Sequence, residues 1–213
     1  MTSTMPDSAA IAETRLLHKM HRAATSLLAE AASREDSPSE ALEELRDFLV
    51  AALEHHHESE DDVLWPQLAK ADPAIGAALT ALDPEHDALD AALDELADAP
   101  MQDRSRLASA AGEVRDLVHV HLEHEEAVLF PALAAHMSDE EWAEFSREVI
   151  ASAPPVAPHL NIGFFDRVGT PDELAVVAAN MPPGAAEVLP FLREQARVTI
   201  ESLQPAAERT MNA

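Results

Sequence analysis

A repeat with constant spacing is the feature of this 213-residue chain that most constrains its fold. His21 and His86 are 65 residues apart, and the same distance separates His56 from His121. The same shift also superimposes three further pairs, namely Glu60 and Glu125, Leu28 and Leu93, and the runs Val63-Leu64-Trp65-Pro66 and Val128-Leu129-Phe130-Pro131. Self-similarity at a fixed distance indicates a duplicated structural unit. Each unit has an isolated His and then, 35 residues later, a His-x-x-x-Glu motif followed by an aromatic-Pro step.

Apolar residues in both units recur every three or four positions, which is the spacing of one face of an α-helix. The stripe of the second segment contains Leu42, Leu45, Leu49, Leu53, His56, Glu60 and Leu64. The stripe of the fourth segment contains Leu107, Val114, Val118, His121, Glu125 and Leu129. The isolated histidines, His21 and His86, lie on similar stripes of leucines in the first and third segments. All six polar residues of the repeat are therefore predicted to face the interior.

The composition agrees with an all-helical protein. Hydrophobic residues make up 47% of the chain but only 4% is aromatic, and Ala and Leu lose little side-chain entropy in a helix. Breaks at Pro38, Pro73 and Pro100 separate the four segments by short connections, which favours antiparallel neighbours. We predict an all-α fold with an up-down-up-down four-helix bundle over residues 10–136. Additional short C-terminal helices are predicted over residues 137–213, as an appendage that packs on the bundle.

The predicted inward position of two carboxylates requires a compensating charge, because a buried carboxylate is costly unless it is paired. No Lys or Arg lies on these stripes near Glu60 or Glu125. A His and a Glu four positions apart on a helix direct their side chains to the same place. Together the two units supply four imidazoles and two carboxylates, a set that suits two metal ions bridged by carboxylates. The alternative is a polar core satisfied by hydrogen bonds alone.

The segment from Arg15 to His136 resembles the hemerythrin-like, HHE cation-binding domain. The resemblance is carried by His56-His-Glu-Ser-Glu60-Asp-Asp-Val-Leu-Trp-Pro66 and by His121-Leu-Glu-His-Glu125-Glu-Ala-Val-Leu-Phe-Pro131, each preceded by an isolated His. It implies a four-helix bundle around a non-haem di-iron centre that reacts with oxygen, nitric oxide or peroxide. It also implies that the metal ligands are His21, His56, Glu60, His86, His121 and Glu125. A ferritin-like E-x-x-H pattern occurs once, off the apolar stripe, and ranks second.

Four further residues are candidates for an additional ligand or a hydrogen-bonding partner of a ligand: His18, His57, Asp90 and His124. Each is one position or one helical turn from a predicted ligand, although surface residues of a helix are common at such places. Asp61 and Glu126 directly follow the two motif glutamates and are candidates for orienting them. A solvated acidic face is the ordinary explanation of those two acids.

The charge and the residue types that are missing exclude several classes of function. The net charge of −26, from 40 acidic and 14 basic side chains, repels phosphate backbones and anionic lipids. We therefore predict neither a nucleic-acid nor a membrane partner, and, without an apolar run or a leader pattern, a cytoplasmic protein. The chain has no Cys and no Tyr, which excludes disulfides and thiolate or phenolate ligands.

Three classes of function stay open for such a site. They are an oxidoreductase that consumes peroxide or nitric oxide, a reversible binder or sensor of oxygen or nitric oxide, and a metal-storage or structural protein. Nearby acids and histidines favour reactivity, because proton donors shorten the life of a bound peroxide. We expect two iron ions as the cofactor, with zinc or manganese as substitutes, a small diatomic or peroxide ligand, and a role in oxidative or nitrosative stress. The sequence leaves the oligomeric state undetermined.

Overall fold

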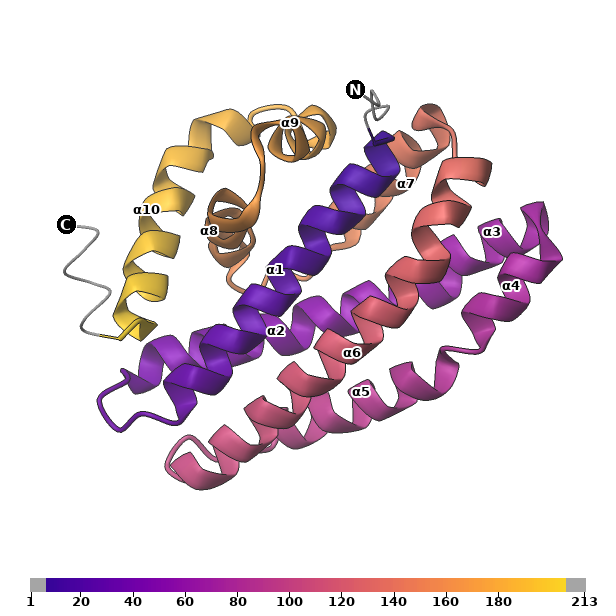
Figure 1. Cartoon of the computed structure of the whole chain (residues 1–213). Helices are drawn as coiled ribbons and strands as arrows, with labels where there is room; N and C mark the ends of the chain where they lie inside the picture. The colour runs from indigo at the N-terminus through magenta and orange to yellow at the C-terminus, as the bar shows by residue number, and fades with distance from the viewer. Residues whose placement is uncertain (1–6, 206–213) are drawn as a thin grey trace, which may run out of the picture.

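The computed structural model describes residues 7–205, and this part of the chain consists of helices joined by turns and short loops, without a strand (Figure 1). The prediction of an all-α fold is confirmed. The last eight residues of the predicted appendage, 206–213, lie outside the described residues.

The N-terminal two thirds of the chain form a ring of four helical rods. The rods consist of α1 (Ala9–Ala32), of α2 (Ser39–Ser59) with η1 (Glu60–Leu64) and α3 (Trp65–Ala71), of α4 (Pro73–Thr80) with α5 (Asp83–Ala97), and of α6 (Arg104–His136). Helix α1 contacts α2 and α6, and α5 contacts the same two helices (Figure 1). This ring encloses one shared interior.

The starts of these helices follow local signals in the sequence. The Ser8 side chain caps α1 by accepting a hydrogen bond from the backbone amide of Ile11. Asp72 caps α4 in the same way, accepting from the amide of Ala74 at 2.8 Å, and Pro73 occupies the first helical position. Both arrangements satisfy a helix N-terminus, where amide groups have no partner within the helix.

The interior of the ring holds two apolar clusters with a polar layer between them. The larger cluster lies towards the end of the ring at which α1 connects to α2. It includes Leu28, Leu42, Leu49, Leu96, Leu107 and Val114. The smaller cluster lies towards the other end and includes Leu64, Trp65, Leu68, Leu79, Leu129 and Leu133. On α2 and on α6, the His-x-x-x-Glu motif lies between the leucines of one cluster and those of the other. The polar motif therefore occupies a layer with apolar packing on both sides.

The passage from α2 to α3 is a π-helical segment rather than an α-helix. The amide of Trp65 donates to the carbonyl of Glu60, five residues earlier. Pro66 follows at once, and because a proline has no amide hydrogen and collides with the carbonyl four residues before it, a wider turn relieves both problems. Pro131 lies at the equivalent place in α6 without such a segment, so the two repeats differ in backbone. Glu60 is the first residue of the π-helical segment.

The C-terminal appendage consists of α7 (Asp139–Ser152), α8 (Pro158–Val168), α9 (Pro171–Asn180) and α10 (Ala185–Leu203). Helices α8 and α9 contact α1, and α10 contacts α8 and α2 (Figure 1). Leu160, Phe164 and Ile200 belong to the larger apolar cluster of the bundle. The appendage therefore shares a core with the bundle.

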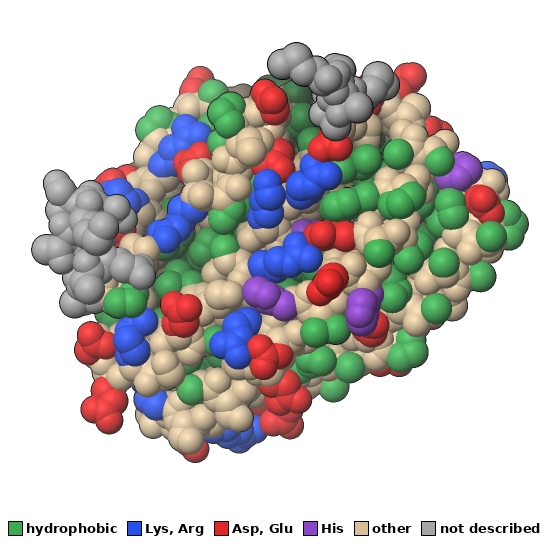
Figure 2. Space-filling model, in the orientation of Figure 1, with side chains coloured by type: hydrophobic (Ala, Val, Ile, Leu, Met, Phe, Trp, Pro, Cys, Tyr) green, Lys and Arg blue, Asp and Glu red, His purple; other side chains and the backbone are tan. Residues whose placement is uncertain are grey.

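The surface carries charges of both signs. On the face shown in Figure 2, Lys and Arg side chains lie among acidic ones. On α1, for example, Lys19 pairs with Glu173 at 2.7 Å and Arg22 pairs with Glu126 at 2.6 Å. Within residues 7–205, no helix is both long enough and apolar enough to cross a membrane.

Candidate metal centre

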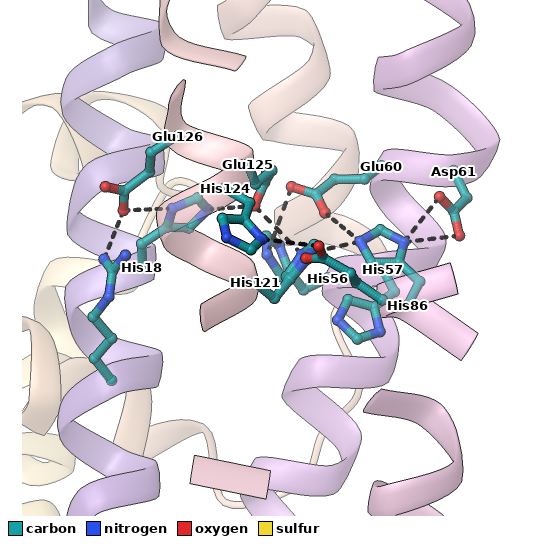
Figure 3. A network of polar contacts seen from close by, with 12 residues as sticks. His18, His56, His57, Glu60, Asp61, His86, His121, His124, Glu125 and Glu126 are labelled. Atoms are coloured by element: carbon teal, nitrogen blue, oxygen red, sulfur yellow. Dashed lines mark hydrogen bonds and ion pairs between the residues drawn. The ribbon is translucent and has the colours of Figure 1, made fainter. Parts of the chain in front are cut away.

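Seven buried side chains that can bind a metal ion meet in the polar layer (Figure 3). They form two groups, and within each group the candidate ligand atoms lie within 4.8 Å of one another. The first group is His57, His86 and His121, and the second is His18, His56, Glu60 and Glu125. Because these residues come from α1, α2, η1, α5 and α6, each rod of the ring contributes to the cluster.

Glu60 lies between an imidazole of each group. Its Oε1 atom is 3.5 Å from Nε2 of His56, and its Oε2 atom is 3.8 Å from Nε2 of His86. The two oxygens of one carboxylate therefore face two different sets of nitrogen atoms. A carboxylate placed in this way could offer one oxygen to a metal ion held by each group.

Glu125, on the opposite helix, also lies between the two groups, but it faces both through a single oxygen. Its Oε2 atom is 3.5 Å from Nε2 of His18 and 3.7 Å from Nε2 of His121. The Nε2 atoms of His86 and His121 lie 3.1 Å apart, so two imidazoles of the first group face each other directly. Two nitrogen lone pairs at that distance repel each other unless a cation or a proton lies between them.

Four histidines of the cluster form a hydrogen bond with a carboxylate through Nδ1, the ring nitrogen that points away from the centre. Two of these Nδ1 pairs are His18 with Glu126 at 3.0 Å and His86 with Asp61 at 3.1 Å (Figure 3). The other two are His57 with Asp90 at 2.8 Å and His121 with Glu85 at 3.1 Å. An ionised carboxylate can only accept hydrogen bonds, so each Nδ1 carries the proton. The lone pair of each Nε2 is then directed into the centre, as in metal-binding histidines.

The carboxylates that hydrogen-bond the clustered histidines differ in part from those that the sequence indicated. Asp61 and Glu126, which the sequence makes candidates for orienting the motif glutamates or members of a solvated acidic face, contact His86 and His18 instead. Glu85, which also accepts from His124, was missed by the sequence analysis. The signal for it was weak, since its one distinguishing mark is its place next to His86 in the first turn of α5.

Several polar atoms of the cluster have no hydrogen-bonding partner although they are buried. They are Nε2 of His18, Nε2 of His56, Oε2 of Glu60 and both carboxylate oxygens of Glu125. Unpartnered buried polar atoms are rare and costly in folded proteins, and these converge on one volume. Cations would satisfy them together, so the residues fit a pair of metal ions.

Burial favours the neutral imidazoles that bind metal, but it disfavours the ionised form of Glu60. Burial, together with the neighbouring histidines, lowers the pKa of His56 well below its usual value, and burial lowers the pKa of His57 to about 4. Burial also lowers the pKa of His121, against the opposing effect of Glu125. The pKa of Glu60 is raised well above its usual value, by burial and by repulsion from Glu125. Neutral imidazoles and two repelling carboxylates both gain from a bound cation.

His21 is placed differently from the other five residues of the predicted ligand set. It is fully buried, its ring lies 4.9 Å from that of His56 between centroids, and it belongs to neither group of ligand atoms. His18, one turn earlier on α1, reaches the cluster instead. Both are on the inner face of α1, so periodicity could not choose between them. Ligation by His21 stays a prediction.

The other three candidates for an additional ligand, His57, Asp90 and His124, differ in how deeply their side chains are buried. His57 belongs to the first group and stacks on His86 with 4.4 Å between ring centroids. The Asp90 side chain is 58% exposed and reaches the centre through its hydrogen bond with His57. The His124 side chain is 55% exposed and contacts Glu85 at 2.9 Å, outside both groups. None of these placements tests ligation, which stays a prediction for each residue.

An acidic cavity of about 400 Å³ reaches the first group from the outside. It lies beside α3, α4 and α5, and its wall includes His86, Asp61, Asp83, Asp87 and Asp90. Its carboxylates give it a negative potential, which attracts cations.

Comparison with protein families identifies one match. The family model described as the hemerythrin HHE cation binding domain covers residues 11–133, which is more than half of the chain. Neither a curated protein nor a solved structure matches the chain. The matched segment contains both His-x-x-x-Glu motifs and all seven residues of the cluster. The chain therefore belongs to the hemerythrin HHE cation-binding domain family.

Proposed function

We propose that this protein holds two iron ions in a hemerythrin-type, up-down-up-down four-helix bundle and reacts there with small oxidants. Peroxide and nitric oxide are the preferred reactants, ahead of oxygen. The observation that carries the proposal is the position of Glu60 and Glu125, each of which lies between histidines of the two groups.

The donor set supports a transition metal such as iron over calcium or magnesium. Imidazole nitrogens and carboxylate oxygens suit iron, manganese and zinc, whereas calcium and magnesium prefer oxygen ligands alone. Iron, when bound, supplies the electrons for redox chemistry with a small oxidant. The protein holds the ligands in place with carboxylates behind the histidines, and two apolar clusters limit access of water from the ends of the bundle.

A chain of hydrogen-bonding groups joins the centre to solvent and supports turnover over reversible binding. Nδ1 of the half-exposed His124 lies 2.9 Å from Oε1 of Glu85. The other oxygen of Glu85 lies 3.1 Å from Nδ1 of the buried His121. These groups can bring a proton from the surface as far as Glu85, beside the predicted ligand His121, and peroxide reduction consumes protons.

The test is metal analysis followed by turnover assays on full-length protein expressed in iron-supplemented medium. We expect close to two iron ions per chain and consumption of hydrogen peroxide by the reduced protein, whose two ferrous ions supply the two electrons, with an added reductant sustaining turnover. A new visible absorption band should form when the reduced protein meets nitric oxide. The His124→Gln variant should keep its iron and consume peroxide more slowly, whereas the exposed residue Glu123 on the same helix provides a matched control as Glu123→Gln.

Two results would replace the proposal by another function of the same site. Iron-loaded protein that takes up oxygen reversibly and leaves peroxide untouched would be a carrier or a sensor. A site filled with zinc and inert towards all three molecules would indicate metal storage or a structural role.

A further inference from the structure

A cavity of about 330 Å³ lies between the bundle and the appendage. On the bundle side its wall includes Leu17 of α1 and Phe48 of α2. On the appendage side it includes Trp142 and Phe145 of α7 and Ile162 of α8. The size and the apolar wall are those of a site for a small organic molecule.

The inner end of this cavity is polar and coincides with one edge of the metal centre. His21, His56 and Glu60 line it there. His21 is fully buried, and neither of its two ring nitrogens has a hydrogen-bonding partner. A neutral imidazole has one donor and one acceptor, and leaving both unused in the interior is costly. Ligation of metal by His21, as the repeat predicts, would use one of these nitrogens, and an occupant with a hydroxyl group at this end would hydrogen-bond the other.

The charges along the wall indicate a neutral occupant. Among the described residues that line the cavity there is no Lys or Arg. At its inner end, the two motif glutamates and the four acids paired with the clustered histidines offset the charge of two divalent metal ions, so an anionic head group would find no net counter-charge. The carboxylate of Glu13 is already engaged, because it accepts hydrogen bonds from Trp142 at 2.8 Å and from Ser146 at 2.6 Å. A cationic head group would instead be drawn to the acidic cavity beside α5.

We propose that the cavity between the bundle and the appendage binds a neutral organic molecule with an apolar body and one hydroxyl or hydroperoxyl head group, the head group lying against His21. The apolar body is buried against the aromatic and aliphatic side chains of α2, α7 and α8. The site is built jointly by bundle and appendage, which gives the appendage a role in ligand selection. Binding in the cavity does not depend on the proposed function. Only the further step, in which the bound molecule meets a reactive metal centre, rests on it.

The test is calorimetric titration of the full-length, metal-loaded protein with 2-phenyl-2-propanol, a neutral alcohol with a compact aromatic body. Two matched probes keep the body and change the head group: isopropylbenzene has none, and 2-methyl-2-phenylpropanoate carries a carboxylate. We expect one binding site for the alcohol. Isopropylbenzene lacks one hydrogen bond, so its affinity should be about two- to tenfold lower than that of the alcohol. The affinity of the carboxylate should be lower still, because its charge would be buried without compensation.

Three variants locate the binding site. Ile162→Trp fills the cavity from the appendage, away from the centre, and should abolish binding of the alcohol while the metal content stays unchanged. Thr80→Trp adds the same bulk at the acidic cavity and should leave binding unaffected. His21→Leu should remove the preference for the alcohol over isopropylbenzene. Circular dichroism and metal analysis of each variant verify the fold.

The outcomes separate this inference from the proposed function. Equal binding of the alcohol to the wild type and to Ile162→Trp, equal binding of the alcohol and the carboxylate, or no binding at all would overturn the inference. Consumption of hydrogen peroxide without binding of the alcohol would leave the proposed function standing alone. Binding of the alcohol by a protein that is inert towards oxidants would leave the cavity assignment standing alone.

Discussion

Nδ1 of His18 lies 3.0 Å from a carboxylate oxygen of Glu126, so a residue of α1 and a residue of α6 hold each other beside the metal centre. Burial opposes ionisation of Glu126, but hydrogen bonds from His18 and Arg22 outweigh it and lower the pKa of Glu126 to about 2. The carboxylate is therefore ionised at neutral pH, and Nδ1 of His18 carries the proton. The free lone pair of His18 faces Glu125 and the centre.

Replacing the acid behind this ligand should weaken metal binding without abolishing it. In Glu126→Gln, the amide holds the imidazole less strongly and lowers its basicity, and we expect the iron affinity to fall by about 10- to 100-fold. Competition with a chelator of known affinity measures the change. The control is Glu123→Gln, at an exposed position of the same helix. Unchanged affinity in Glu126→Gln would show that the pair is structural only.

Removing histidines of the two groups should remove metal. His56→Ala and His121→Ala each delete a nitrogen that faces a motif carboxylate, so we expect each to lose most of the roughly two metal ions per chain. The helices should persist, because the leucine stripes still pack. Metal analysis and far-ultraviolet circular dichroism measure the two effects. Wild-type metal content in the double variant would end the assignment of this cluster as a metal centre.

The two histidines of α1 give a sharper comparison, because they are one turn apart and equally buried. Since His18 and not His21 belongs to a ligand group, His18→Ala should lose more metal than His21→Ala. Parallel metal analysis of the two purified variants decides the matter. The reverse order would support ligation by His21, as the repeat predicts.

In the metal-free protein, the contribution of His57 to stability should fall as the pH falls. Burial lowers the pKa of His57 in the folded protein to about 4, against a usual value of 6.5, so below 6.5 the unfolded chain takes up a proton that the folded chain does not. The contribution of His57 to stability is complete above pH 6.5 and is lost as the pH falls towards 4. Urea unfolding at several pH values measures it. His57→Gln should have a shallower dependence over this range, whereas an identical dependence would exclude His57 as a source.

Truncation after Met137 should leave a less stable bundle that still binds metal. All seven residues of the cluster precede this point, but Leu160, Phe164 and Ile200 contribute to the larger apolar cluster. Their loss exposes apolar surface on α1 and α2, so a lower melting temperature and self-association are expected. Thermal unfolding and sizing chromatography measure both effects. A truncated chain that neither folds nor binds metal would show that bundle and appendage form one cooperative unit.

The sequence by itself determined the helices and the inward face that carries the motif. Each His-x-x-x-Glu pair lies one helical turn apart on a leucine stripe, and this local periodicity holds wherever the helix packs. Accordingly the structure brings His56, Glu60, His86, His121 and Glu125 into one buried cluster. The starts of helices at capping residues and prolines were equally local.

Only the tertiary structure decided which neighbouring residues complete the cluster. His18 and His21 share one face of α1, so their spacing is uninformative, and the rotation of that helix against α6 brings His18 to the centre. Glu85 supports His121 across two helices, a pairing that no periodicity encodes. The cavity beside His21 exists because the appendage packs against the bundle. Such contacts depend on how helices are placed relative to one another, and that is set by the packing of the whole chain.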